Sequence, residues 1–239
     1  MIDNKDEILL KAKEWFRESI ARNHIKNTEK LKKSSEFNIN PFLAVYLSNF
    51  LTGNSSAESI AKALILPRVL GTSITTSFGQ NIQSFTSSVL SAFGSTTSGI
   101  DIEFVDQIDG RRKYCQLKSG PNTINKDDVE TVSNHFRTIK NLARTNHLQI
   151  SVNDLIVGVI YGERENLSSH YKKIESQHDY PVVIGTDFWH RLTGDSDFYT
   201  DLIEAIGSVA IDADYSQELL EVIQSLAATE EIQKLSNLE

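Results

Sequence analysis

The stretch Ile100–Lys118, IDIEFVDQIDGRRKYCQLK, carries the strongest indication of the fold. Two extended runs in it flank Asp109-Gly110, a dipeptide typical of a two-residue type I′ turn. They predict a β-hairpin in which Ile108 pairs with Arg111.

This register gives the hairpin one polar and one apolar face. The predicted cross-strand pairs are Asp101 with Lys118, Glu103 with Gln116, Ile102 with Leu117, and Phe104 with Cys115. Because directly opposed side chains share a face, the first two pairs project four polar groups from one side. The other two pairs form an apolar side, which we expect to pack against the core.

Such a polar platform suits a hard divalent cation. Mg²⁺ prefers oxygen ligands, usually one or two protein carboxylates completed by waters and substrate phosphates. Asp101 is the expected fixed ligand, with Gln116 Oε1 and the Leu117 backbone carbonyl as neutral donors. Glu103 can bind directly or through water. Lys118 is expected to orient and help deprotonate an attacking water and to offset the charge of the phosphorane.

At this point the residues resemble a known family. Asp101, then Gln116-Leu117-Lys118 on the second strand of a hairpin, then a helix and a buried strand, look like the PD-(D/E)xK nuclease superfamily, particularly its type II restriction endonucleases. The resemblance covers roughly residues 71 to 195. It implies an α/β (α+β) fold with a central mixed β-sheet flanked by helices, a divalent metal (Mg²⁺, or Mn²⁺ in its place), and hydrolysis of DNA phosphodiesters.

One departure from the family pattern concerns the metal site. Gln116 stands where the family usually has an acid, which removes one negative charge, although a Gln-x-Lys version resembles the Mrr-like branch of the superfamily. The acid that relatives often add from a preceding helix corresponds here to Gln80 or Gln83. Glu103 or Glu58 can supply the missing charge. We expect Gln116→Glu to preserve or raise activity.

Periodicity and capping residues predict the other elements. The expected helices cover 3–35 with a break near Asn23–Asn27, 41–50, 57–66, 78–93, 127–146 and 188–193, and the expected strands cover 155–161 and 181–184. Gly71–Ser77 is expected to be a polar loop. These elements divide into a helical N-terminal region (1–70), a nuclease core (71–198) and an acidic helical C-terminal region (199–239), expected to form one compact domain.

Two polar segments are candidates for contact with DNA, because hydroxyl, amide and ammonium groups bind phosphates and base edges. Ser119, Asn122, Thr123, Asn125 and Lys126 follow the lysine of the motif, and Ser73, Thr75 and Thr76 lie in the expected loop.

Composition and charge limit the classes of protein to which the chain can belong. The chain has 239 residues, of which 39% are hydrophobic, and no stretch reaches the roughly 18 apolar residues that cross a bilayer. The start of the chain lacks the layout of an export signal, and Cys115 is the single cysteine, which together indicate a reducing, cytoplasmic setting with no membrane contact. Residues 1–150 carry 19 basic and 15 acidic residues, whereas 151–239 carry 5 and 17. One face can therefore meet an anionic partner while another stays acidic.

The sequence thus predicts a Mg²⁺-dependent type II restriction endonuclease that cuts double-stranded DNA at a specific short sequence. We expect a homodimer, because two symmetry-related sites cut both strands of a palindrome most simply, with the interface on the N-terminal or the C-terminal helices. By resemblance, a DNA methyltransferase is its functional partner. Two alternatives stay open: an Mrr-like nuclease that depends on DNA modification, and a non-catalytic DNA-binding module with a degenerate site.

Overall fold

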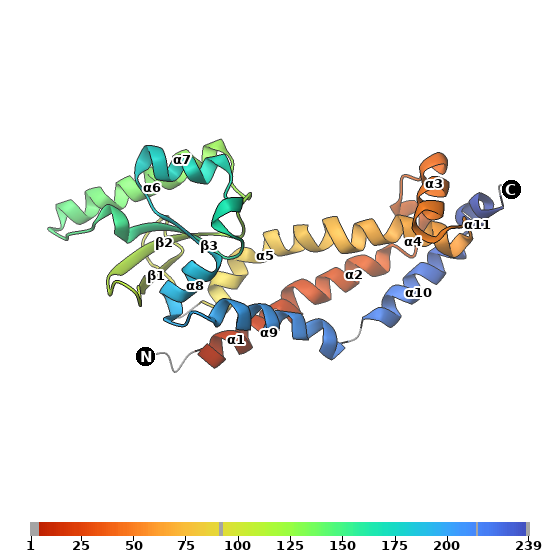
Figure 1. Cartoon of the computed structure of the whole chain (residues 1–239), viewed down its shortest axis with the longest axis horizontal. Coiled ribbons are helices and arrows are strands. Elements are labelled where there is room, and N and C mark those ends of the chain that lie inside the picture. Colours follow the sequence, from red (N-terminus) through yellow and green to blue (C-terminus); the bar gives the residue numbers. More distant parts are fainter. Residues whose placement is uncertain (1–4, 91–92, 214, 238–239) are drawn as a thin grey trace. The chain divides into compact units, whose positions relative to one another are not determined.

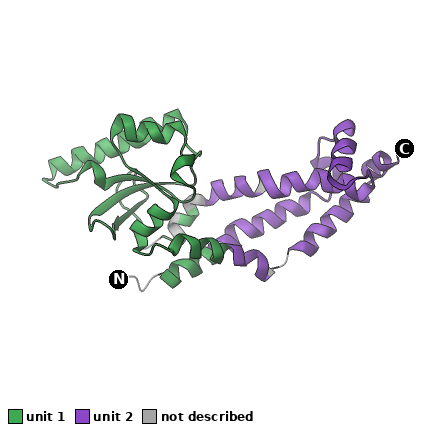
Figure 2. Ribbon diagram, in the orientation of Figure 1, with its two compact units in different colours: residues 1–13, 82–206 green, residues 14–81, 207–239 purple. Residues whose placement is uncertain are grey.

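The structure, a computed structural model, describes residues 5–90, 93–213 and 215–237. The chain divides into two compact units (Figure 2), residues 1–13 with 82–206 and residues 14–81 with 207–239. The division falls within three helices, α1 (Lys5–Trp15), α5 (Ile74–Ser88) and α9 (Phe198–Ala213). Each unit has a hydrophobic core of its own.

The first unit contains a four-stranded mixed sheet with the order β1-β2-β3-β4; Figure 1 labels β1, β2 and β3 of this sheet. Its strands are β1 (Ile102–Val105), β2 (Arg112–Lys118), β3 (Leu155–Val159) and β4 (Val182–Ile184), and only β1 and β2 run antiparallel. Its helices are α6 (Lys126–Thr145), α7 (Ser169–His178) and α8 (Gly185–Thr193), with 3₁₀ turns η5 (Val152–Asp154) and η6 (Arg164–Asn166). The predicted central mixed sheet flanked by helices is confirmed.

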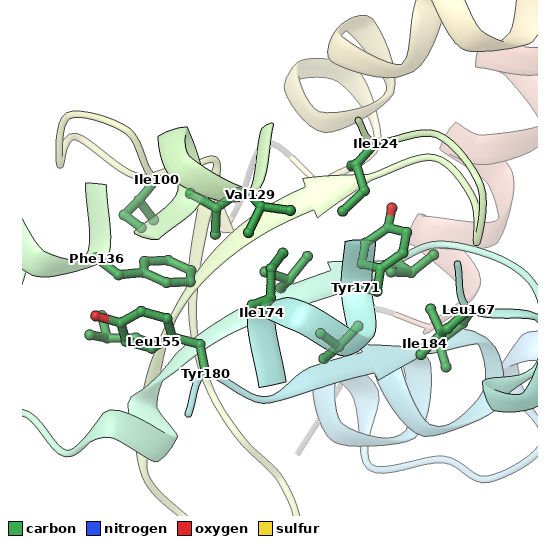
Figure 3. Packing of buried hydrophobic residues seen from close by; sticks show 14 of the residues in the cluster. Ile100, Ile124, Val129, Phe136, Leu155, Leu167, Tyr171, Ile174, Tyr180 and Ile184 are labelled. Carbon is green, nitrogen blue, oxygen red and sulfur yellow. The ribbon is translucent and has the colours of Figure 1, made fainter. Parts of the chain in front are cut away.

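Helices cover both faces of this sheet. Phe136 of α6 and Ile174 of α7 are fully buried in one cluster with Leu155 and Val157 of β3 (Figure 3). On the other face the predicted apolar side of the hairpin is buried as expected, with Ile102, Phe104, Cys115 and Leu117 at most 9% exposed. On that face the ring of Phe104 lies against the ring of Phe188 from α8, with 6.5 Å between their centroids, so the sheet lies between two helical layers.

The predicted two-residue turn of the hairpin is wrong. Asp106 N donates to Arg111 O (2.9 Å) and Gly110 N donates to Asp106 O (2.8 Å), which makes a four-residue turn over 107–110. Gly110 has a φ of 69°, a left-handed conformation that glycine adopts without strain.

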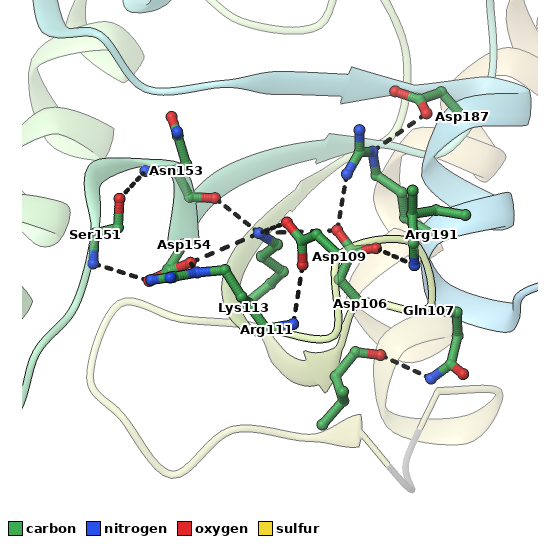
Figure 4. Close-up of polar contacts among 12 residues, drawn as sticks. Asp106, Gln107, Asp109, Arg111, Lys113, Ser151, Asn153, Asp154, Asp187 and Arg191 are labelled. Atoms are coloured by element: carbon green, nitrogen blue, oxygen red, sulfur yellow. Dashed lines mark hydrogen bonds and ion pairs between the residues drawn. The ribbon is translucent and has the colours of Figure 1, made fainter.

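Buried charges select this wider turn (Figure 4). The carboxylate of Asp106 is fully buried and accepts hydrogen bonds from Ile108 N (2.8 Å) and from Arg191 Nη1 of α8 (2.9 Å). The ammonium of Lys113 is equally buried and lies 2.5 Å from Asp109 Oδ2. Because a tighter turn would withdraw these groups from one another, tertiary ion pairing overrides the local turn signal.

The wider turn moves the register of the hairpin by two residues. Ile102 pairs with Cys115 and Glu103 with Tyr114, so the predicted partners are wrong. Side chains alternate between faces with a period of two, and a slip of two residues therefore leaves every strand side chain on its predicted face.

The second unit is helical. It contains η1 (Phe16–Ala21), α2 (Arg22–Lys30), η2 (Ser34–Glu36), α3 (Pro41–Thr52), α4 (Ala57–Pro67), η3 (Arg68–Ser73), α10 (Ser216–Ala227) and α11 (Glu230–Ser236). Asn40 caps α3 by accepting from Phe42 N and Leu43 N, and Ser56 caps α4 by accepting from Ser59 N. Within the described part of the chain, no helix is long and apolar enough to cross a membrane.

The expected helix break near Asn23–Asn27 is wrong, because helical structure continues through η1 and α2 to Lys30. Polar side chains there bond to the helix itself: Asn23 Nδ2 donates to Ser19 O (2.8 Å) and Thr28 Oγ1 to His24 O (2.8 Å).

The expected loop Gly71–Ser77 is also wrong, since α4 continues through the π-helical η3 into α5. A side chain again bonds to the backbone of its own helix, because Thr75 Oγ1 donates to Gly71 O (3.0 Å). Burial of Val69 in the core of this unit holds the segment in place. Hydroxyl-rich composition therefore did not prevent a helix whose apolar side is packed.

Candidate active site

Three predicted catalytic residues meet at the end of the hairpin opposite its turn. Asp101 directly precedes β1, while Gln116 and Lys118 lie near the end of β2, beside Val157 and Val159 of β3. α6 and α7 cover this face of the sheet, so the polar residues of β2 lie partly under a helical layer.

Asp101 is anchored to β2 through both its backbone and its side chain. Its N–H donates to Cys115 O (3.0 Å), and its Oδ2 accepts from Leu117 N (2.7 Å). The residue as a whole is exposed, but its carboxyl group lies against the strand, and desolvation there raises its pKa. The Leu117 hydrogen bond, Lys118 and His135 oppose this rise. Asp101 is thus a fixed carboxylate within electrostatic reach of the lysine.

Gln116 is buried, and its amide nitrogen is fully used. Nε2 donates to Gly99 O and to His135 Nδ1 of α6, the latter at 2.6 Å. Among the described residues no hydrogen bond uses Oε1. The oxygen of this amide is therefore the atom that remains to serve as a ligand.

The backbone carbonyl of Leu117 lies on the same edge of β2 as Asp101. In an extended strand the N–H and C=O of one residue point to the same side. Since the N–H of Leu117 points to Asp101 Oδ2, its carbonyl faces that side as well.

Lys118 is partly buried beside an acid of α6. Its side chain is 25% exposed, and its Nζ lies 3.6 Å from Asp128 Oδ1. The other oxygen of that carboxylate accepts from Asn125 N (2.9 Å), which fixes the carboxylate in the first turn of the helix. Lys118 is thus directed by a defined acidic partner.

Glu103 has its own set of partners. It accepts from Ser95 Oγ (2.6 Å), Thr97 Oγ1 (2.8 Å) and Arg112 Nη1 (3.1 Å). Desolvation raises the pKa of its carboxyl, but these three contacts outweigh desolvation and leave the pKa below its ordinary value. The register places Glu103 opposite Tyr114. It is therefore a charged carboxylate held by neighbours of its own.

The oxygen donors at this end of the hairpin fit a hard cation. Within the described residues no group of three or more His, Cys, Asp or Glu side chains is arranged to hold a metal ion. Asp101 supplies one carboxylate, and the Gln116 amide and the Leu117 carbonyl add neutral oxygens. Mg²⁺ uses such a set, with water and substrate phosphates completing its shell.

The predicted DNA-contact residues of the first unit follow Lys118 directly. Ser119 is buried and Thr123 Oγ1 donates to Gly120 O (2.9 Å), whereas Asn122 and Lys126 are exposed. Asn125 caps α6 by accepting from Asp127 N and Asp128 N. In this segment Asn122 and Lys126 are therefore the candidates whose exposed side chains can contact DNA, whereas Ser119 is buried and Asn125 caps the helix.

The other predicted residues belong to the second unit or to α5. Thr75 and Thr76 are exposed on helix α5, and Gln80 is exposed about one helical turn beyond them. Glu58 pairs with Lys62 (2.6 Å) within α4. The side chains of Ser73 and Gln83 lie outside those that the structure describes.

Two residues at the site were not predicted from the sequence. His135 contacts Gln116, and Asp128 faces Lys118, both from α6. Their separation of seven residues places them on one side of the helix, beside the buried positions Val132 and Phe136. That spacing is visible in the sequence, but the strand that α6 covers is not.

Comparison with models of known protein families identifies a family that matches most of the chain. The family model described as Type II restriction endonuclease EcoO109I matches residues 11–214. A search of curated proteins finds no match to this chain.

Proposed function

Because this chain belongs to the EcoO109I family of type II restriction endonucleases, we propose that it hydrolyses double-stranded DNA at a specific short sequence with Mg²⁺ as cofactor. The family makes it a nuclease that acts on DNA. The observation that carries the finer proposal is the convergence of Asp101, Gln116 and Lys118 at one end of the hairpin.

The residues of the site carry out two tasks, binding of the cation and activation of the attacking water. Asp101, Gln116 Oε1 and the Leu117 carbonyl hold the cation, which when bound supplies Lewis-acid activation of the phosphate and of water. Lys118 orients the attacking water and offsets the negative charge that develops on the phosphate. Asp128 keeps the ammonium of Lys118 directed along the helix face. Glu103, whose carboxyl group is charged, is available as a further ligand of the cation.

Plasmid digestion tests this function. Methylated and unmethylated plasmids are incubated with and without Mg²⁺, and the ends are sequenced. We expect Mg²⁺-dependent cutting at one short sequence, and loss of cutting in both Asp101→Ala and Lys118→Ala with folding and most DNA affinity retained. Cutting that requires methylated DNA would favour the Mrr-like alternative. Absence of cutting, with DNA binding unchanged in Lys118→Ala, would favour the non-catalytic module.

An exposed apolar surface on α3 supports the homodimer. No charged residue occurs between Glu36 and Glu58, and Phe42 and Phe50 are 88% and 78% exposed. Exposed patches of this kind mark association surfaces. We assign the two-fold interface to this surface, so that Phe50→Lys should yield monomers by light scattering while Ile211→Lys, at an equally exposed position of α9, should not. A monomeric wild type, or a dimeric Phe50→Lys, would contradict this assignment.

The cellular setting and the functional partner belong to the same proposal. We place the protein in the cytoplasm because Cys115 is the single cysteine, which suits a reducing compartment. An unrestrained endonuclease would cut the DNA of its own cell, so a DNA methyltransferase is its functional partner. Among the DNA-contact candidates, the exposed Asn122 and Lys126 are assigned to backbone or base contact beside the metal site.

A further inference from the structure

The amide of Gln116 is held in one of its two possible orientations. Its side chain is buried, and Nε2 lies between two acceptors, Gly99 O and His135 Nδ1. A backbone carbonyl can only accept a hydrogen bond, so the atom facing Gly99 must be the nitrogen. A half-turn of the amide would bring two oxygen atoms together.

The same constraint defines the state of His135. With Nε2 of Gln116 as donor, Nδ1 of His135 must accept, which places the imidazole proton on its own Nε2. The ring is also wedged against the chain, because a Cβ on Gly99 would lie 2.6 Å from His135 Cγ. α6 holds the ring in this place through Val132 and Phe136, both fully buried.

A side-chain amide that binds a cation must be held in one orientation, whereas a carboxylate need not be. The two oxygens of a carboxylate are equivalent, so either rotation presents an oxygen to a cation. An amide presents oxygen in only one of its two orientations. A Gln-x-Lys site therefore requires a contact that selects the orientation.

We propose that His135 is a positioning residue for Gln116, whose Nδ1 accepts the amide proton and thereby turns Oε1 toward the cation. This inference rests on the proposed metal site of Asp101 and Gln116. Outer-shell partners of this kind change metal affinity by about 10–100-fold when they are removed.

Binding of Mn²⁺ alone to the full-length protein tests the proposal without any turnover. Free Mn²⁺ is measured by electron paramagnetic resonance in titrations of the wild type and variants at pH 8. We expect His135→Leu to weaken Mn²⁺ binding at least tenfold. His135→Asn, whose Oδ1 can accept the same proton, should stay within about threefold of the wild type. His178→Leu, which removes a histidine at the end of α7, is the matched control and should bind normally.

A second background separates positioning from mere packing. In Gln116→Glu the ligand has two equivalent oxygens, so adding His135→Leu should cost less than about threefold in Mn²⁺ affinity. An equal loss in both backgrounds would overturn the proposal, as would a His135→Asn variant as weak as His135→Leu. Asp101→Ala shows whether the site itself exists. If it abolishes Mn²⁺ binding while His135→Leu does not weaken it, only the positioning role is refuted. If it leaves Mn²⁺ binding unchanged, the metal site and the positioning role fall together.

Discussion

Replacing Gln116 by glutamate reverses the polarity of a buried contact. In the wild type Nε2 donates to Gly99 O and His135 Nδ1, and the residue is 6% exposed. An introduced carboxylate has no proton for either acceptor, and one of its oxygens would face the Gly99 carbonyl. A buried acceptor left without its donor costs about 1–3 kcal/mol. We therefore expect the metal-free Gln116→Glu protein to lose about 2–3 kcal/mol of stability at pH 8.

This loss should depend on pH with a defined sign. A proton on the new carboxyl restores a donor toward the Gly99 carbonyl in the folded state, so the folded-state pKa of this carboxyl is raised above its unfolded value. The contribution of such a group is present below the unfolded pKa and is lost as pH rises through the folded pKa. A deficit of about 2 kcal/mol corresponds to roughly 1.5 pKa units. The variant should thus approach the wild type as pH falls to 5.

Urea denaturation between pH 5 and pH 8 in the presence of EDTA measures the effect. Gln149→Glu adds the same charge at an exposed loop position and should change stability by less than about 0.5 kcal/mol. The added charge also favours a cation, so Gln116→Glu should gain more stability from Mg²⁺ than the wild type does. Full stability of the metal-free variant at pH 8, or a deficit equal at all pH values, would refute this account of the amide.

Three further substitutions or conditions test the surroundings of the site. Lys113→Ala leaves the buried Asp106 with one cation fewer and should cost about 3–5 kcal/mol, and a thermal denaturation midpoint within a few degrees of the wild type would contradict this. Burial raises the pKa of Asp101, so on acidification this carboxylate is protonated at a higher pH than a free aspartate. We therefore expect Mg²⁺-supported cleavage to begin to fall at a pH above the ordinary aspartate pKa of about 3.9. A pH–rate profile whose acidic limb lies at about 3.9 or lower would argue against this role of the carboxylate. Gly158→Ala places a Cβ 2.6 Å from Phe188 Cε2 and should destabilise the protein by about 1–3 kcal/mol in urea, whereas an unchanged midpoint would show that α8 moves aside at no cost.

Local capping signals determine where several helices begin. The helices that start at Pro41 and Ala57 follow Asn40 and Ser56, whose side chains accept from backbone N–H groups two or three residues ahead. The apolar side of the hairpin was also predictable, because alternation along a strand depends only on neighbouring positions. For the same reason the sequence predicted that Asp101, Gln116 and Lys118 lie on one face of the hairpin.

The register of the hairpin could not be predicted from its own residues. The Asp-Gly dipeptide favours a two-residue turn, but the buried Asp106 binds Arg191, which lies 85 positions further along the chain. The slip of two residues leaves Gln116 and Lys118 on the face where they were predicted, because side chains alternate between faces with a period of two. A slip of one would have moved Gln116 and Lys118 to the apolar side.

The features that local patterns predict are therefore those that depend on a few adjacent residues: the caps, the period of each element and the faces that it presents. Which helix lies over β2, and hence that His135 reaches Gln116 and Asp128 reaches Lys118, becomes visible in the folded chain alone. A hydrogen bond between distant segments depends on how both pack against a shared core, and neither segment encodes that packing by its own residues.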